Sequence, residues 1–160
     1  MNAQDSGSRP DNAGVVAPPP ALFGTALAAG LVLHWLRPLP FSFPFPVRAA
    51  GGALVVAGLV LSVLVMRHFR RANTPVVPWG ETRRLVISGP YRFSRNPDYL
   101  GQAFIVAGVG LLFGALWVFV LLVPALLLVR YGVIAREERY LERRFGDEYR
   151  AFWRRVRRWL

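Results

Sequence analysis

Residues 99–135 of the chain read YLGQAFIVAGVGLLFGALWVFVLLVPALLLVRYGVIA. The part from Phe104 to Val129 carries no ionisable side chain, so it can lie in the hydrocarbon of a bilayer. A single helix through all of residues 99–135 would reach about 55 Å, nearly twice the ~30 Å thickness of that hydrocarbon. One long tilted helix is the less favoured alternative. We therefore expect a helical hairpin, with helices at residues 99–112 and 115–138 and a turn near Gly110 to Gly114.

Two further apolar stretches precede this hairpin. Residues 21–36 are apolar apart from His34, and residues 49–66 carry no charged side chain, so each approaches the ~20 residues that a spanning helix needs. The connection between them, residues 37–48, is rich in prolines that cannot continue a helix. We therefore predict an all-α integral membrane protein in which about four transmembrane helices form a bundle. Residues 21–160 would then make up a single membrane domain.

The composition agrees with a membrane protein and excludes several kinds of site. The chain has 160 residues, of which 54% are hydrophobic, and its formal net charge is +11. Such a chain is too apolar in blocks for an ordinary soluble fold. Cysteine is absent, which excludes disulfides, thiolate metal sites and a cysteine nucleophile. Because a zinc site would have to use only His34, His68 and carboxylates, we expect no metal site.

The placement of arginine predicts which side of the membrane each connection faces. All 20 basic residues are arginine, and they crowd residues 67–98 and the C-terminal segment, whereas the turn of the hairpin has none. By the positive-inside rule, both Arg-rich segments are cytoplasmic. A chain with four spans would then have its N-terminus inside as well. Residues 1–20 have no apolar periodicity and are rich in Ser, Gly, Asn, Asp and Pro, which predicts a disordered tail.

The C-terminal segment, residues 139–160, has the pattern of an amphipathic helix. Its apolar residues recur at steps of roughly three and four, and they are Leu141, Phe145, Phe152, Val156 and Trp159. Arginines surround this stripe, so we expect the segment at the membrane interface, attracted by anionic headgroups. We expect Gly146 to break or bend it. Nucleic-acid binding would also explain the charge, but the basic residues all lie beside predicted membrane ends, so we expect no nucleic-acid partner.

Two polar patches bracket the hairpin. The first reads GPYR at residues 89–92 and RNPDYLG at residues 95–101. The second contains Glu137 and Glu138, followed by FGDEY at residues 145–149. Since the chain of a hairpin returns to the side on which it began, we expect both patches on one side of the membrane, close enough to share a site.

The strap before the hairpin, residues 67–98, is predicted to lie along the membrane surface. Pro90 and Pro97 each disfavour helix at the residue before them, so this part of the chain should be extended or turning. Asp98 or Asn96 can cap the helix that follows. The free backbone N–H groups of that first turn can then bind an anion.

The two glutamates have no partner on their own helix. No arginine lies three or four residues from Glu137 or Glu138, and the neighbouring Arg136 and Arg139 point elsewhere on a helix. Two acids at the mouth of a bundle therefore need solvent, an arginine from another segment, or a cationic or hydroxylated ligand. A solvated helix face is the plain interpretation of the pair alone. The first patch, at the partner end of the hairpin, favours a binding site.

In order and spacing, these motifs resemble the isoprenylcysteine carboxyl methyltransferase family, which is similar to phospholipid N-methyltransferases. The order is Gly-Pro-Tyr-Arg, Arg-Asn-Pro-Asp-Tyr-Leu-Gly, an apolar hairpin, Glu-Glu and Phe-Gly-Asp-Glu-Tyr. The resemblance covers residues 89–159, nearly half of the chain. It implies a multi-span enzyme of the bacterial inner membrane that uses S-adenosylmethionine and releases S-adenosylhomocysteine. The acceptor of the methyl group would be a lipophilic small molecule or a lipid.

The resemblance also implies which residues form the site. The family's cofactor contacts correspond to two opposing walls of a pocket. One wall consists of Asn96, Tyr99, Leu100 and Gly101, and the other consists of Glu137 and Glu138. We expect Arg95 and Asn96 to be the catalytic residues, and from the chemistry of the cofactor Arg95 or Arg92 would orient an anionic group. Eukaryotic members have His where this chain has Asn96, so an imidazole base is unavailable here. A carboxylate acceptor would not need one.

Two other functions stay open on the sequence alone. A membrane NADPH-dependent reductase of the steroid or isoprenoid type would use the Arg-rich strap to bind phosphates. A non-catalytic membrane scaffold would bind neither cofactor. The acceptor is also open, because a prenylated carboxylate, an ethanolamine lipid and a quinone-like molecule would each fit an apolar entrance.

Overall fold

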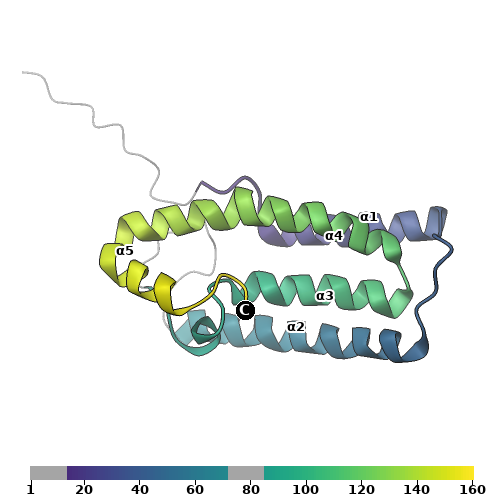
Figure 1. Ribbon diagram of the computed structural model, residues 1–160, viewed down its shortest axis with the longest axis horizontal. Helices are drawn as coiled ribbons and strands as arrows, with labels where there is room; N and C mark the ends of the chain where they lie inside the picture. Colours follow the sequence, from purple (N-terminus) through teal and green to yellow (C-terminus); the bar gives the residue numbers. More distant parts are fainter. Residues whose placement is uncertain (1–13, 72–84) are drawn as a thin grey trace, which may run out of the picture.

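The computed structural model describes residues 14–71 and 85–160, and within these ranges every regular element is a helix (Figure 1). The elements in chain order are α1 (Pro19–Leu36), α2 (Phe45–Arg71), the 3-10 turn η1 (Gly89–Arg92), α3 (Pro97–Phe113), α4 (Leu116–Leu128), the π-helical turn η2 (Val129–Ile134) and α5 (Ala135–Arg155). The predicted all-α class is therefore confirmed for the part of the chain that the structure describes.

The lengths of the helices match a membrane protein. Among the described residues, three helices are long and apolar enough to cross a bilayer, namely α1, α2 and the continuous helix from Leu116 to Arg155. The apolar part of that last helix ends at Ile134, and the polar α5 begins there. α3 is a shorter apolar helix. The protein is thus an all-α membrane protein in which α3 and α4 form the predicted C-terminal hairpin.

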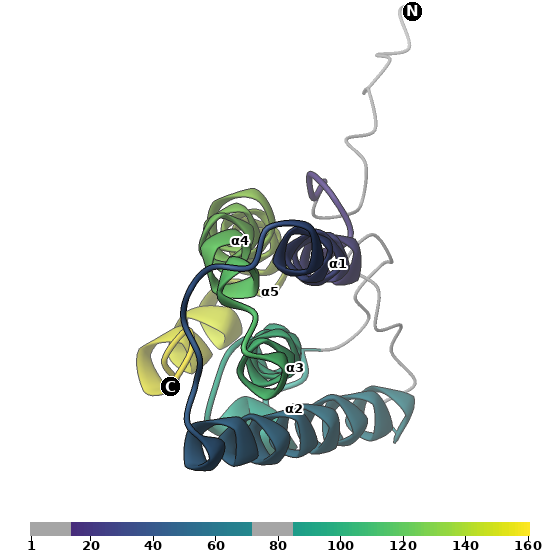
Figure 2. The same cartoon turned by 90° about the vertical axis from the view of Figure 1, so that its right-hand side faces the viewer.

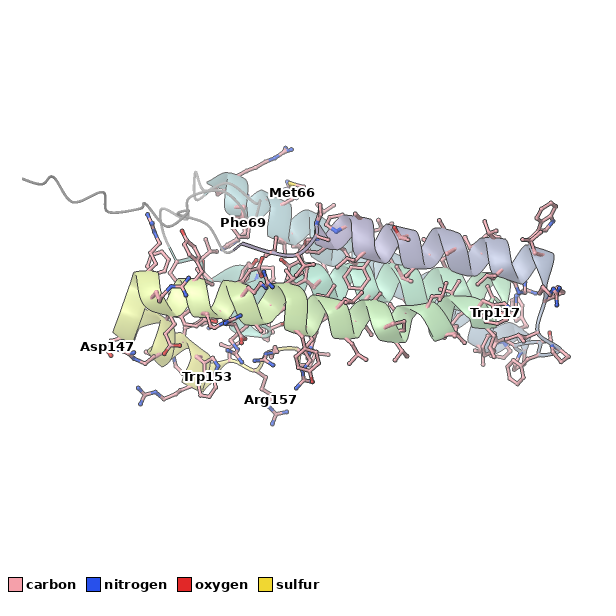
Figure 3. The ribbon with its side chains drawn as sticks, turned by 90° about the horizontal axis from the view of Figure 1, so that it is seen from above. Met66, Phe69, Trp117, Asp147, Trp153 and Arg157 are labelled. Atoms are coloured by element: carbon pink, nitrogen blue, oxygen red, sulfur yellow. The ribbon has the colours of Figure 1, made fainter. Side chains whose placement is uncertain are left out.

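The four apolar helices are arranged in two pairs. α2 lies along α3, and α1 lies along α4, as the view down the bundle shows (Figure 2). Trp117 marks one end of the bundle, whereas Met66, Phe69, Asp147 and Trp153 lie at the opposite end (Figure 3). We call this opposite end the polar end. It holds the beginning of α3 and the whole of α5, which are the two elements that carry the predicted patches.

The hairpin turns at Gly114 and Ala115, at the end of the predicted region and one residue beyond it. Gly114 has a left-handed backbone (φ 68°, ψ 23°), the conformation that commonly ends a helix and that glycine adopts without strain. The amide of Ala115 donates to the carbonyl of Gly110 at 2.8 Å, which satisfies a carbonyl at the end of α3. Gly110 itself lies inside α3, so the turn is tighter than the predicted range.

Two glycine pairs let α2 and α3 pack unusually closely. A Cβ atom on Gly58 would lie 2.5 Å from the carbonyl oxygen of Gly101, and one on Gly108 would lie 2.6 Å from that of Gly51. Gly51 and Gly58 are about two turns apart on α2, as Gly101 and Gly108 are on α3, so both pairs fall on one line of contact. Small residues drive helix association in lipid by allowing such an approach. The beginning of α3 is therefore fixed against α2.

Several predicted boundaries were wrong because prolines begin helices here. α1 starts at Pro19, two residues inside the predicted tail, and α2 starts at Phe45 with Pro46 in its first turn, inside the predicted connection. A proline is tolerated in a first turn, where its missing N–H has no helical partner. α2 also continues to Arg71, so the first residues of the predicted strap are helical. Residues 1–13 of the tail and 72–84 of the strap lie outside the described residues.

The last helix does not stop at residue 138 as predicted. It continues through α5 to Arg155, but Gly146 has a non-helical backbone (φ 50°, ψ −119°), and α5 bends sharply there (Figure 1). The predicted break at Gly146 is therefore confirmed. The chain beyond the bend turns back onto the polar end, where Phe152 is buried and Trp159 packs against the core. These two side chains of the apolar stripe therefore contact the protein, and the position of the segment at the membrane interface stays a prediction.

Candidate functional site

The strap reaches α3 through a short ordered turn. η1 begins at Gly89, whose positive φ of 61° brings the backbone against the imidazole of His68, and α3 begins at Pro97. Asn96 holds the N-cap position of α3, but its side chain makes no capping bond. Its side-chain amide instead donates to the carbonyl of Arg158 at 3.0 Å. The prediction that Asp98 or Asn96 caps α3 is therefore wrong for Asn96, because the C-terminal segment competes for its side chain.

The two predicted patches meet at the polar end. The hydroxyl of Tyr99, in the first turn of α3, donates to Oε1 of Glu137, in the first turn of α5, at 2.7 Å. Residues 38 positions apart in the chain therefore share one hydrogen bond. The expectation that the hairpin brings both patches to one side is confirmed by this contact.

Glu138 is held by two arginines from outside its own helix. The Arg95 guanidinium lies 3.0 Å from Oε1 of Glu138, and Arg158 donates to both carboxylate oxygens at 2.6 and 3.1 Å. The side chain of Arg95 is only 8% exposed, and its guanidinium also lies over the ring of Trp153 at 5.3 Å. The hydrogen bond to Glu138 raises the pKa of the Arg158 guanidinium, so this arginine stays charged. Of the three partners considered for the glutamates, an arginine from another segment is the one found here.

Glu137 has a different environment from its neighbour. It lies beyond the apolar span, which ends at Ile134, and no ion pair to it is found within residues 14–71 and 85–160. The pKa of Glu137 is raised to about 7, and burial is the largest cause. The hydrogen bond from Tyr99 lowers this pKa, whereas the charges of Asp98 and Glu138 raise it. A carboxylate of this kind favours a bound cation, because a cation would compensate its charge.

Leu100 and Gly101 have structural contacts that differ from each other. The amide of Leu100 donates to the carbonyl of Asn96 at 3.1 Å, as the first turn of a helix requires, and its side chain is half-buried. Gly101 faces α2, since a Cβ atom there would lie 2.9 Å from Oγ of Ser62. The structure therefore brings Arg95, Asn96 and Tyr99 together with the glutamates, whereas Gly101 packs against α2.

Arg158 and Ser94 are site residues that the sequence did not identify. Arg158 is one of several arginines in the C-terminal segment, and no spacing distinguished it from Arg157 or Arg155. Ser94 was missed in the same way; its hydroxyl accepts from the amide of Asn96 at 3.1 Å and donates to the carbonyl of Arg158 at 3.3 Å. Both roles depend on the bend at Gly146, because it turns the C-terminal segment back toward α3. A local sequence pattern can predict the bend but not the direction that the chain takes after it.

A cavity opens beside Glu138 in the elbow of α5. It has a volume of about 500 Å³, within the usual range for small-molecule pockets. Its walls come from both arms of the bent helix and are Ala135, Glu138, Arg139, Glu142, Tyr149, Arg150, Trp153 and Arg154. A ligand in this cavity would reach the Glu138 carboxylate from the outside of the bundle.

Comparison with known proteins identifies the family. No solved structure matches the chain. An uncharacterised protein of Haemophilus influenzae is 57% identical over 35 residues, which are 22% of this chain and 56% of that protein, so the match spans about half of the relative. A profile of the phospholipid methyltransferase family matches residues 47–148, from the first turns of α2 past the bend in α5. This region is more than half of the chain and contains the first patch and all of the second except Tyr149, and the chain therefore belongs to the phospholipid methyltransferase family.

Proposed function

We propose that this protein transfers a methyl group from S-adenosylmethionine to a lipophilic or amphipathic acceptor at the cytoplasmic face of the bacterial inner membrane. The observation that carries the proposal is the contact between the two patches, made by Tyr99 with Glu137 and by Arg95 with Glu138. Both contacts fall within the residues that match the family. The phospholipid methyltransferase family supports a membrane methyltransferase, and the residues at this end support the cofactor.

The chemistry of these side chains fits that cofactor. S-adenosylmethionine supplies a methyl group on a sulfonium cation, together with an ammonium, a carboxylate, a ribose diol and an adenine. Glu137 and Glu138 can accept hydrogen bonds from ammonium or hydroxyl groups, and a buried carboxylate without a cation partner favours a positive ligand. Arg95 can bind an anionic group. Tyr99 and Leu100 can shape the wall between them.

The site does not need a strong base to promote methyl transfer. The side chain of Asn96 is an amide that takes no proton near neutral pH, and it already donates to a carbonyl. Residues of this chain can still promote an in-line displacement by aligning the acceptor with the methyl group and by excluding water. Arg95 and Asn96 would act in this positioning role, which suits an acceptor that is already a nucleophile, such as a carboxylate.

Equilibrium binding to the purified protein tests the proposal. We expect S-adenosylhomocysteine to bind with micromolar affinity and NADPH to give no response. Binding of NADPH alone would favour a reductase, and binding of neither would favour a scaffold. Incubation with isotopically labelled S-adenosylmethionine and lipid extract, followed by mass spectrometry, would then identify the acceptor.

The orientation in the membrane can be tested separately. The chain has no cysteine, so single introduced cysteines report the side on which each end lies. We expect thiols introduced at exposed positions of α5 to react only with reagents that reach the cytoplasm. Labelling of α5 from the periplasm would contradict the proposed orientation.

A further inference from the structure

The last residues of the chain, 156–160, fold back over the candidate site. Val156 leaves the helix with an extended backbone (φ −122°, ψ 132°), and the chain then runs beside the strap. The amide of Arg95 donates to the carbonyl of Arg157 at 2.9 Å, and Trp159 packs against the core. Figure 1 shows this segment and the C-terminus beside the beginning of α3. The segment is therefore attached to the site by both backbone and side-chain contacts.

One residue of this segment, Arg158, already binds two of the side chains that we propose as cofactor contacts. The carbonyl of Arg158 accepts from the side-chain amide of Asn96 at 3.0 Å. Its guanidinium donates to both oxygens of Glu138 at 2.6 and 3.1 Å. A ligand that binds the Asn96 amide and the Glu138 carboxylate would therefore need the groups that Arg158 now holds.

Of the two arginines on Glu138, Arg158 is the one that can leave. Arg95 is 8% exposed and lies between Glu138 and the ring of Trp153, within the strap. The side chain of Arg158 is 30% exposed, and Leu160, two residues further along the chain, is exposed as well. Departure of Arg158 would leave Glu138 with one arginine in place of two, which lowers the local positive charge that a cationic ligand meets.

We infer that Arg158 is an internal competitor of the cofactor and that residues 156–160 form a latch, which opens before the cofactor binds Glu138 and Asn96. This inference rests on the proposed function and adds a residue that sets the affinity of its site. The Arg158 guanidinium takes the place of the cationic and donor groups of the ligand. A site that is open about a tenth of the time binds its ligand about tenfold more weakly than one that is always open.

Substitution of Arg158 tests the latch against a matched control. Arg158→Gln removes the ion pair to Glu138, and we expect it to bind S-adenosylhomocysteine about tenfold more tightly, by ~1.4 kcal/mol. Arg157→Gln makes the same change of charge one residue away, on an exposed side chain whose backbone contact is kept, and should leave the affinity unchanged. Arg158→Lys keeps the charge but loses the two-pronged geometry, so we expect an intermediate affinity.

A second readout follows the latch without any cofactor. Ser94 is 2% exposed and its hydroxyl donates to the carbonyl of Arg158, so the segment covers it. Ser94→Cys would introduce the only thiol of the chain. We expect a maleimide to label this thiol several times faster when Arg158→Gln is added than when Arg157→Gln is added.

The outcomes separate the latch from the proposed function. Weaker binding of S-adenosylhomocysteine by Arg158→Gln, or labelling of the thiol no faster than in the Arg157→Gln control, would overturn the latch and leave the proposed function standing. Failure of every variant and of the unmodified protein to bind S-adenosylhomocysteine would overturn the proposed function, and the latch with it.

Discussion

Replacing Gly58 by alanine should loosen the pair formed by α2 and α3. A Cβ atom at this position would lie 2.5 Å from the carbonyl oxygen of Gly101, about 1 Å short of the 3.4–4 Å of ordinary contact. It would also lie 2.8 Å from the Cγ1 atom of Ile105 and 3.0 Å from its amide nitrogen. Two of these three atoms belong to the backbone of α3, which cannot turn aside as a flexible side chain can. The helices must therefore move apart.

The magnitude follows from two opposing effects. Overpacking of this kind costs about 1–3 kcal/mol, whereas alanine in place of glycine inside a helix gains up to ~1 kcal/mol. We therefore expect Gly58→Ala to lower the free energy of unfolding by about 1–2 kcal/mol. Gly52→Ala is the matched control on the same helix, because its Cβ atom would lie 3.7 Å from the nearest atom, a side-chain carbon of Leu112. The control should be neutral or slightly stabilising.

Reversible unfolding in mixed detergent and dodecyl sulfate micelles measures both variants, with helicity followed by circular dichroism. A Gly58→Ala protein as stable as the Gly52→Ala control would refute the close contact between α2 and α3. Gly101, which faces Gly58, was predicted to contact the cofactor. Its role in packing can be separated from that predicted role by measuring both stability and affinity in Gly101→Ala. If packing is the main role, Gly101→Ala should reduce the stability of the protein as well as any affinity for S-adenosylhomocysteine.

Three further predictions concern the polar end. Glu138→Gln should weaken binding of S-adenosylhomocysteine by about ten- to a hundredfold, while Glu148→Gln, the same change on an exposed side chain outside the cavity, should not. Calorimetry of both variants would show an unchanged Glu138→Gln affinity if the glutamate were only structural. Burial raises the pKa of Glu137 to about 7, so the folded protein holds a proton that the unfolded chain releases near the ordinary glutamate pKa of 4.5. Stability should therefore fall as the pH rises from 4.5 to 7, and Glu137→Gln should flatten this slope in unfolding measurements made across that range. Gly146→Ala should cost about 1–3 kcal/mol of stability and speed labelling of a thiol at Ser94, because alanine is strained at a φ of 50°; labelling at the unmodified rate would show that the bend does not control the latch.

Hydropathy predicted the helical hairpin and the meeting of the two patches, whereas the orientation that arginine placement indicates stays a prediction. The hairpin followed from comparing the length of one apolar stretch with the thickness of a bilayer, and the meeting of the patches followed from the hairpin. Tyr99 and Glu137 were therefore placed together although 38 positions separate them. A constraint on length acts over the whole stretch, so it needs no knowledge of individual contacts.

The contacts of the C-terminal segment could not be predicted in this way. An amphipathic stripe shows that one face is buried, but lipid and protein both satisfy it, and Phe152 and Trp159 turned out to face protein. The capping preference of Asn96 is likewise local, and it loses to a carbonyl 62 positions away. Both sets of contacts arise where distant segments of the chain meet, which a local pattern cannot predict.

The π-helical turn η2 explains how one long helix can serve both the membrane and the site. Each residue of an α-helix advances the next side chain by about 100°, and a π-helical turn holds an additional residue, so the helix after η2 is rotated relative to the helix before it. Within η2, the neighbours Val133 and Ile134 are both fully buried, as expected where the buried face changes register. Glu137, rather than the adjacent Arg136, is then the residue that reaches Tyr99, while Arg136 bonds to the carbonyl of Gly14. The apolar face of α4 and the acidic face of α5 thus both point into the bundle. In a regular α-helix through the same residues, the acidic face would be rotated relative to the apolar face.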